Sequence, residues 1–316
     1  MCQNDLQKLL ILLKSRTGIN FNYYRDNFVE TRIKYRIFNL KIPDVKSYLN
    51  YIRKNPGEID KFLKKFTINT SFFFRDRDVF ETLGLLICES LGYNQSYFQF
   101  KTIMKDDQFK KLSSTEIPKE ELIRMLQHLS LYKKIKNQKN PVLYIWSCPC
   151  ASGQEPYSIA MLFDTLEEII PNFPGYKIVA SDIDKHVLEH AKRGIYFIDV
   201  LKEVPEYFKT KYFTKIEQPI IPAYQICDKI KKKVEFVQQD IIQEQNEKGY
   251  KYDIILCRYL LIYIQKEYQE IILRNLQNHL ARGGLMILGN TESLLHLRIN
   301  LQSLRQKIPF YTEIQK

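Results

Sequence analysis

Several features that define large classes of proteins are missing from this sequence of 316 residues. No uninterrupted apolar run approaches the roughly 20 residues that a membrane-spanning helix needs. The first residues do not form a basic segment followed by an apolar one, so we expect no secretory signal. The six cysteines include the pair Cys148-Pro-Cys150, but no second Cys or His pair at ligand spacing accompanies it, and we expect no metal site. These absences predict a cytoplasmic protein whose cysteines are reduced.

The chain has fewer acidic than basic residues: 36 Asp and Glu against 48 Lys and Arg, which gives a net charge of +12. Residues 1–66 alone hold 14 Lys and Arg against 6 Asp and Glu, a surplus of 14 − 6 = 8. An excess of this kind favours an acidic partner: nucleic acid, an anionic membrane or an acidic protein surface. A Lys-rich solvated surface would give the same numbers, and charge alone does not choose between these readings.

The pattern of a strand, a tight turn and a helix occupies residues 142–163. Val142–Trp146 is a short apolar run of β-branched and aromatic residues, which predicts a buried strand. Cys148–Gly153 consists of small residues and one proline, so a ligand could approach the backbone closely. Glu155-Pro156 then opens a helix, with proline in the first turn. A second strand over Tyr176–Ser181 ends in Asp182, as in sheets that bind a nucleoside.

The rest of the chain divides around this unit. Residues 1–66 read as a small basic domain of helices, including one over 23–40, and 67–141 as a linker with a polar and aromatic motif followed by an atypical insert. Residues 142–316 alternate strands and helices, which predicts a doubly wound, mostly parallel sheet covered on both faces. Residues 195–232 break this alternation and read as an inserted subdomain. The remaining predicted strands are 234–240, 252–257, 285–288 and an edge strand over 308–312, with helices over 185–193 and 267–281.

Two phosphate-binding patterns are absent from the turn after the first strand. It lacks both G-x-G-x-x-G and G-x-x-x-x-G-K-[ST], so a dinucleotide is disfavoured and a P-loop is excluded. Glu155, Asp182 and Asp240 place a carboxylate at or just after three predicted strand ends. A small nucleoside without a pyrophosphate fits this arrangement. S-adenosylmethionine meets that description, because its sulfonium is a cation that carboxylates attract.

Four motifs, in this order and spacing, resemble the CheR-type chemotaxis receptor glutamate methyltransferases. The resemblance covers nearly the whole chain except about 88–140. It implies a class I methyltransferase domain, a small all-α N-terminal domain and a small β-subdomain inserted after the second strand. The motifs are NTSFFFRD (69–76), WSCPCASGQEPYSIA (146–160), ASDID (180–184) with AKRGIY (191–196), and YDIILCRYLLIY (252–263) with GNTES (289–293).

The resemblance implies methyl transfer from S-adenosylmethionine to glutamate side chains on the cytoplasmic coiled coils of chemoreceptors, giving glutamyl methyl esters and S-adenosylhomocysteine. No general base is needed, because a carboxylate with a pKa of about 4.3 is already an anion at neutral pH. Arg75 and Tyr263 are expected to orient the substrate carboxylate. Arg32, Lys34 and Arg36 are expected to face the acidic receptor bundle. The resemblance assigns the cofactor to Asn69, Ser71, Arg75, Glu155, Asp182, Asp240, Ile241, Arg258 and Tyr259.

Four positions depart from the family pattern. Pro149 replaces the usual Gly of the turn, Gln154 the first Glu, and Tyr259 the Asn after Arg258, while Asp240 is often Asn in the family. Proline has no N–H, so the carboxylate of the cofactor should be held differently. We expect an active monomeric enzyme with a modified cofactor pocket.

Another absence concerns the inserted subdomain, since residues 195–248 contain no glycine. Some family members bind a pentapeptide at the receptor C-terminus through a Gly-containing loop there, so we expect no such tether. Nucleic-acid binding and membrane insertion are not expected either. Two alternatives stay open: an RNA methyltransferase, favoured by the charge but lacking an Asn/Asp-Pro-Pro-aromatic tetrapeptide, and a binding module that has lost the cofactor.

Overall fold

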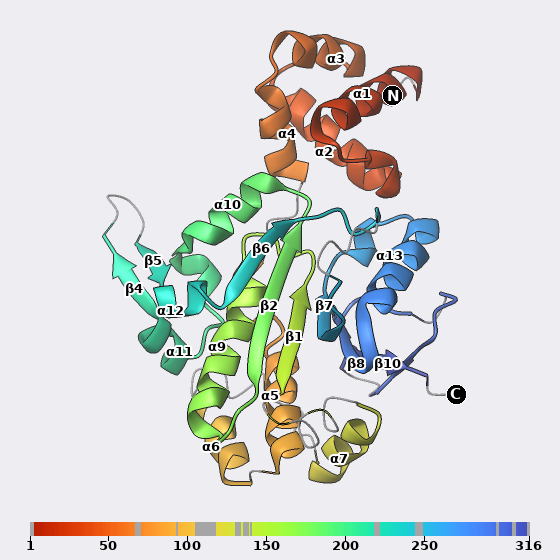
Figure 1. The fold of residues 1–316 in the computed structure, drawn as a ribbon. Helices are drawn as coiled ribbons and strands as arrows, with labels where there is room; N and C mark the ends of the chain where they lie inside the picture. The colour runs from red at the N-terminus through yellow and green to blue at the C-terminus, as the bar shows by residue number, and fades with distance from the viewer. Residues whose placement is uncertain are drawn as a thin grey trace.

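The computed structural model describes most of the chain. The described residues are 3–66, 71–92, 94–104, 118–129, 134, 139, 141–217, 222–243, 249–294, 297–304 and 308–314. Figure 1 shows a group of N-terminal helices at one end of a central sheet, above the point where strand β2 ends.

The N-terminal helices bury a hydrophobic cluster of their own. Leu9, Leu13, Ile33, Tyr48 and Phe62 are its most buried members, each completely or almost completely enclosed. The repeat of apolar residues at helical spacing explains why these segments are helices. They are α1 (Gln3–Thr17), the short 3-10 helix η1 (Phe21–Tyr23), α2 (Asp26–Asn39), α3 (Val45–Lys54) and α4 (Glu58–Phe66).

The helix predicted over 23–40 is confirmed with a later start, and the expectation for Arg36 is wrong. The helix predicted from residue 23 begins at Asp26, because Tyr24 is extended and forms a β-bridge with Ile264. Arg36 does not face outward: its side chain is 11% exposed and it donates two hydrogen bonds, of 2.7 and 2.8 Å, to the carboxylate of Glu58. The phenol of Tyr48 donates to the same carboxylate at 3.0 Å.

The central sheet has seven strands in the order β6-β2-β1-β7-β8-β10-β9. The first five are parallel, and β10 runs antiparallel to β8 and β9. The mostly parallel sheet is therefore confirmed. Its strands are β1 (Val142–Ser147), β2 (Gly175–Asp182), β6 (Val234–Gln238), β7 (Tyr252–Cys257), β8 (Leu280–Leu288), β9 (Leu301–Ser303) and β10 (Phe310–Glu313).

The predicted edge strand is wrong in position. β10 lies inside the sheet between β8 and β9, and the short β9 takes the edge. Pro309 stands just before β10, so it removes no N–H from the strand that pairs on both sides. Three residues are too few to show the alternation that predicts a strand, which is why the sequence did not indicate β9.

Helices cover both faces of the sheet (Figure 1). Leu143 and Ile145 of β1 pack with α9 (Gln154–Ile169), whereas Tyr144 and Trp146 pack with α13 (Lys266–His279) on the opposite face. This is the alternation of side chains along a strand. The short helix α10 (Lys185–Arg193) ends at Gly194, whose φ of 65° is left-handed, as the sequence predicts.

Helices α5 (Arg77–Leu91), α6 (Asn94–Met104) and α7 (Lys119–Gln127) share the hydrophobic cluster of α9. Figure 1 shows α6 and α7 near the amino ends of β1 and β2, away from the N-terminal helices. Phe100 of α6 fits against Gly84 of α5, where an added Cβ would lie 2.2 Å from the ring. The described helices α6 and α7 of this segment thus extend the core that packs around α9.

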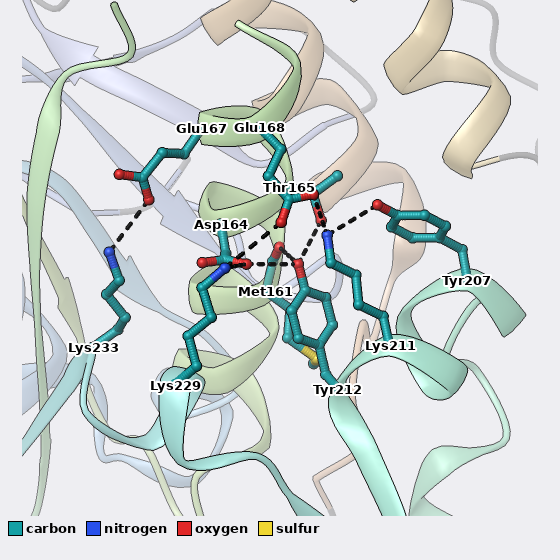
Figure 2. A network of polar contacts seen from close by, with 10 residues as sticks. All are labelled: Met161, Asp164, Thr165, Glu167, Glu168, Tyr207, Lys211, Tyr212, Lys229 and Lys233. Atoms are coloured by element: carbon teal, nitrogen blue, oxygen red, sulfur yellow. Dashed lines mark hydrogen bonds and ion pairs between the residues drawn. The ribbon is translucent and has the colours of Figure 1, made fainter.

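The described residues between 195 and 231 include a small three-stranded antiparallel sheet in the order β3-β5-β4. Its elements are β3 (Ile195–Phe197), η3 (Ile198–Leu201), α11 (Glu206–Tyr212), β4 (Phe213–Ile216), β5 (Ala223–Ile226) and α12 (Asp228–Lys231). Polar contacts join this subdomain to α9 (Figure 2). The buried Asp164 accepts hydrogen bonds from Lys229 at 2.7 Å and from Tyr212 at 3.0 Å, and Lys211 pairs with Glu168.

Candidate cofactor site

The turn between β1 and α9 is shaped by Gly153, whose φ is +92°. An added Cβ there would lie 2.8 Å from the Cβ of Ala191, so both the backbone and the packing require glycine. Ala151 is also left-handed, with φ of +46°, and its N–H donates to Asp182 at 2.9 Å. The Cys148–Pro149 peptide bond is cis. The turn therefore exposes backbone beside a carboxylate.

A cavity of about 400 Å³ lies over the carboxyl ends of β1, β2, β6 and β7. This is where open α/β sheets bind ligands, and the volume is within the range of small-molecule sites. Asn69 lies outside the described residues. The other residues that the resemblance assigns to the cofactor or the substrate all line this cavity: Ser71, Arg75, Glu155, Asp182, Asp240, Ile241, Arg258, Tyr259 and Tyr263.

Asp182 ends β2 with its carboxylate turned to the backbone of two loops. Its Oδ2 accepts the N–H of Ala151 at 2.9 Å and its Oδ1 accepts the N–H of Asp184 at 3.0 Å. Burial raises the pKa of Asp182 from its ordinary 3.8 to about 6, although these N–H groups oppose the rise. Each carboxylate oxygen has a second lone pair, so the group can also accept hydroxyl donors from a ligand in the cavity.

Glu155, in the first turn of α9, and Asp76 hold the buried guanidinium of Arg258 between them. Arg258 donates to Glu155 at 3.2 Å, to Asp76 at 2.5 Å and to the carbonyl of Arg75 at 2.7 Å. The hydroxyl of Ser147 donates to the other oxygen of Glu155 at 2.7 Å. Burial alone would lower the pKa of Arg258, but the two carboxylates outweigh it and the pKa is raised. Arg258 thereby ties the segment 71–76 to the end of β7.

Glu292 organises the loop that follows β7. Its carboxylate accepts the backbone N–H groups of Tyr259, Leu261 and Gly289 at 2.7–2.8 Å. Tyr259 is left-handed, with φ of +60°. A Cβ on Gly289 would lie 2.9 Å from Oε2 of Glu292 and 3.0 Å from the N of Tyr259, so glycine permits this close approach.

The N-terminal domain contributes aromatic side chains that the sequence analysis did not place at the cofactor site. Tyr24, Phe28 and Phe66 line the cavity. The ring of Phe28 lies 5.0 Å from that of Tyr263, and the N–H of Arg25 donates to the carbonyl of Tyr263 at 2.9 Å. Burial, and then the charges of Asp182 and Asp240, raise the pKa of Tyr24. Helical periodicity marks such residues only as buried, so it carried no signal of this second role.

The departures from the family pattern fall in different places. Pro149 and Tyr259 line the cavity, whereas the buried Gln154 does not and instead accepts a hydrogen bond from the hydroxyl of Ser152 at 2.9 Å. The carboxylate of Asp240 accepts the N–H of Ile242 at 2.9 Å and the side-chain amide of Gln243 at 3.0 Å. Asp240 thus shapes the loop after β6 as well as the cavity wall.

The described residues contain neither a cluster of metal-binding side chains nor a membrane-spanning helix. In the part of the chain that the structure describes, no three His, Cys, Asp or Glu side chains gather as a metal-binding group. Among the same residues, no helix is both long and apolar enough to cross a bilayer.

Comparison with known proteins identifies the family. The all-alpha domain of the CheR methyltransferases matches residues 4–67, and their SAM binding domain matches residues 118–309. The chain is 25% identical to a chemotaxis protein methyltransferase of Borreliella burgdorferi, over 92% of this chain and 89% of the relative. It is 26% identical to chemotaxis protein methyltransferase 2 of Pseudomonas aeruginosa, over 97% of this chain and 92% of the relative. It is also 26% identical to the chemotaxis protein methyltransferase of Escherichia coli, over 90% of this chain and 83% of the relative.

The cofactor follows from these matches and from the site. The cavity offers carboxylates beside strand ends, exposed backbone at the turn and an apolar wall at Ile241, which suit the ribose, the amino-acid end and the adenine of S-adenosylmethionine. The two family models together match most of the chain, residues 4–67 and 118–309, and the second match ends just before β10. The protein is therefore a class I, S-adenosylmethionine-binding methyltransferase, and the chain belongs to the CheR methyltransferase family.

Proposed function

We propose that this enzyme methylates glutamate side chains on the cytoplasmic parts of chemoreceptors, and that it acts in the cytoplasm as a monomer. The observation that carries the proposal is the convergence of the motif residues on one cavity at the carboxyl edge of the sheet. The names of its relatives support the chemotactic role. A match to models of this family favours a protein substrate over RNA.

Different described residues contact different parts of the cofactor. Asp182 accepts the ribose hydroxyls, and Asp240 with Ile241 flanks the adenine. Ser71 and Glu155 stand near the amino-acid end, where the charge of Glu155 also holds Arg258 in place. The resemblance adds Asn69 to this set. Pro149 offers no N–H to the amino-acid end, so the neighbouring backbone must satisfy the carboxylate of the cofactor there.

Methylation of a carboxylate needs no proton transfer. Bound S-adenosylmethionine supplies an electrophilic methyl group; as the carboxylate oxygen bonds to that carbon, the electron pair of the carbon–sulfur bond stays on sulfur. The protein must hold the substrate glutamate in line with that bond and partly desolvated. Arg75 and Tyr263 are the orienting groups, because both line the cavity and both can donate hydrogen bonds to a carboxylate.

The receptor approaches over the N-terminal helices. α2 carries Lys34, with its side chain 62% exposed, and the exposed rings of Tyr35 and Phe38. Phe38 is 80% exposed and could pack on a receptor helix. Arg36 is left out of this surface because Glu58 holds it.

Lys34→Glu should raise the KM for a receptor fragment about fivefold while the Kd for S-adenosylhomocysteine stays within twofold. Arg32 is kept, because its guanidinium lies 4.8 Å from the ring of Phe28, which lines the cavity. Exposed charge pairs contribute up to about 1 kcal/mol each, which sets this scale. Lys119→Glu is the matched control, since it reverses an exposed lysine of α7 at the opposite end of the sheet (Figure 1). An unchanged KM would remove α2 from the docking surface.

The expectation that binding needs no tether is tested with the same receptor fragments, with and without their C-terminal tails. Because the inserted subdomain has no glycine, we expect both forms to bind equally well. A large loss of affinity on removal of the tail would refute this expectation. Transfer of a labelled methyl group to the fragment, and none to RNA, tests the function itself.

A further inference from the structure

The side chain of Tyr259 contacts two residues of the segment 71–76. The guanidinium carbon of Arg75 lies 3.4 Å from the centre of the Tyr259 ring, which is van der Waals distance for two stacked planar groups. The phenol donates a hydrogen bond to Oδ2 of Asp76. The same oxygen of Asp76 accepts from Arg258 at 2.5 Å. Tyr259 is therefore a bridge between the end of β7 and the arginine that the proposed function assigns to the substrate.

The backbone holds Tyr259 in a conformation that tyrosine rarely adopts. Its φ is +60°, and the residues on either side of Arg75 are also left-handed, Phe74 at +54° and Asp76 at +58°. Such residues cluster where the surrounding structure fixes a functional geometry. Glu292 supplies part of that constraint, because its carboxylate accepts the N–H of Tyr259 at 2.8 Å.

Asparagine, the usual family residue at this position, tolerates a positive φ better than tyrosine does. The tyrosine is thus not explained by the backbone. Its ring does what an asparagine could not, since it covers one face of the Arg75 guanidinium. Hydrogen bonds leave a guanidinium from its edge, so stacking fixes the group without using a donor.

We propose that Tyr259 is a positioning residue: its ring holds Arg75 flat and directs the edge of the guanidinium into the cavity, toward the carboxylate of the substrate glutamate. This inference rests on the proposed function and deepens it. It also differs from the cofactor-binding role that the resemblance implies for Tyr259, and the two roles give different results.

The experiment compares Tyr259→Phe and Tyr259→Asn in steady-state methylation of a receptor cytoplasmic fragment. Tyr259→Asn should raise the KM for the fragment roughly fivefold, the scale of a half-buried cation–π contact. Tyr259→Phe keeps the ring and should stay within about twofold of the wild type. The Kd for S-adenosylhomocysteine, measured by calorimetry, should stay within about twofold for both variants, because in this proposal the ring sets only the edge of Arg75 that faces the substrate carboxylate.

Two further measurements exclude a merely structural effect. The unfolding midpoint of Tyr259→Asn should stay close to that of the wild type, since relief of the backbone strain offsets the lost contacts with Arg75 and Asp76. In an Arg75→Ala background, Tyr259→Asn should have no further effect on the KM, as expected when one residue acts through another. Tyr207→Asn, on the exposed surface of α11, is the matched control.

The outcomes separate this inference from the function beneath it. A wild-type enzyme that transfers no methyl group to the fragment overturns the proposed function and this inference together. An active wild type overturns the inference alone if Tyr259→Asn leaves the KM unchanged, or if it weakens S-adenosylhomocysteine binding instead. Equal losses in Tyr259→Phe and Tyr259→Asn would assign the effect to the hydroxyl, and would also overturn the role of the ring.

Discussion

Cofactor affinity should depend on pH through Asp182. Burial raises the pKa of this carboxyl to about 6 in the free protein, and only the ionised form accepts both ribose hydroxyls. Lowering the pH below 6 protonates Asp182 in the free protein, so the cofactor meets a neutral carboxyl. The affinity for S-adenosylhomocysteine is therefore compared at pH 7.5 and pH 5.

The magnitude follows from linkage. Each pH unit below about 6 should weaken binding about tenfold, or about 1.4 kcal/mol, until the lower pKa of the complex is reached. The effect on unfolding has the opposite sign. Because the folded pKa is raised above the ordinary 3.8, the stability that Asp182 contributes is fully present below 3.8 and is lost as the pH rises through about 6. The ligand should therefore raise the unfolding midpoint more at pH 7.5 than at pH 5.

Isothermal calorimetry at several pH values measures this directly. Asp182→Asn is the control, because an amide does not titrate: its affinity should be weaker than the wild type at pH 7.5 and nearly flat with pH. Glu292 is a second buried carboxyl whose pKa burial raises, and a slope that persists in Asp182→Asn would assign the effect to another group. A flat wild-type profile between pH 5 and 7.5 would refute the reasoning.

Two further predictions concern packing and stability. Gly289→Ala should lower the free energy of unfolding by about 1–3 kcal/mol, because its Cβ would crowd Glu292 and Tyr259; an unchanged denaturant midpoint would contradict the close approach. At the contact between α9 and the inserted subdomain (Figure 2), Lys229→Met should cost about 2 kcal/mol, since it leaves the buried Asp164 without its cation, although water screens the half-exposed lysine. Asp164→Asn should cost only about 1 kcal/mol, and the double variant should recover part of the loss. A larger effect of Asp164→Asn than of Lys229→Met would show that the ion pair does not carry this contact.

The strand ends could be predicted because a buried parallel strand appears in the sequence as a short apolar run followed directly by polar residues. The run of Val142–Trp146 and the acid at Asp182 identified both the sheet and the edge where a ligand binds. The seven-stranded sheet and the cavity at its carboxyl edge agree with that prediction. The short β9 and the interior place of β10 were missed, because strand order depends on contacts that no local pattern records.

The contribution of Tyr24 and Phe28 could not be predicted for a different reason. In sequence, both belong to the helix predicted over 23–40, and the bridge between Tyr24 and Ile264 and the contact of Phe28 with Tyr263 bring them to the cavity. Arg36 shows the converse, since a basic residue expected on the surface is held by Glu58. Charge and periodicity describe a residue by its neighbours in sequence, whereas these roles depend on neighbours in space.

The central claim is that the acceptor is a glutamate carboxylate. The most direct measurement is the release of labelled methanol by mild base, after incubation of the enzyme, methyl-labelled S-adenosylmethionine and a receptor cytoplasmic fragment. We expect base-labile label that disappears when the acceptor glutamates are changed to alanine and falls sharply with Arg75→Ala. Label that resists base, or that appears on RNA and not on the fragment, would contradict the claim.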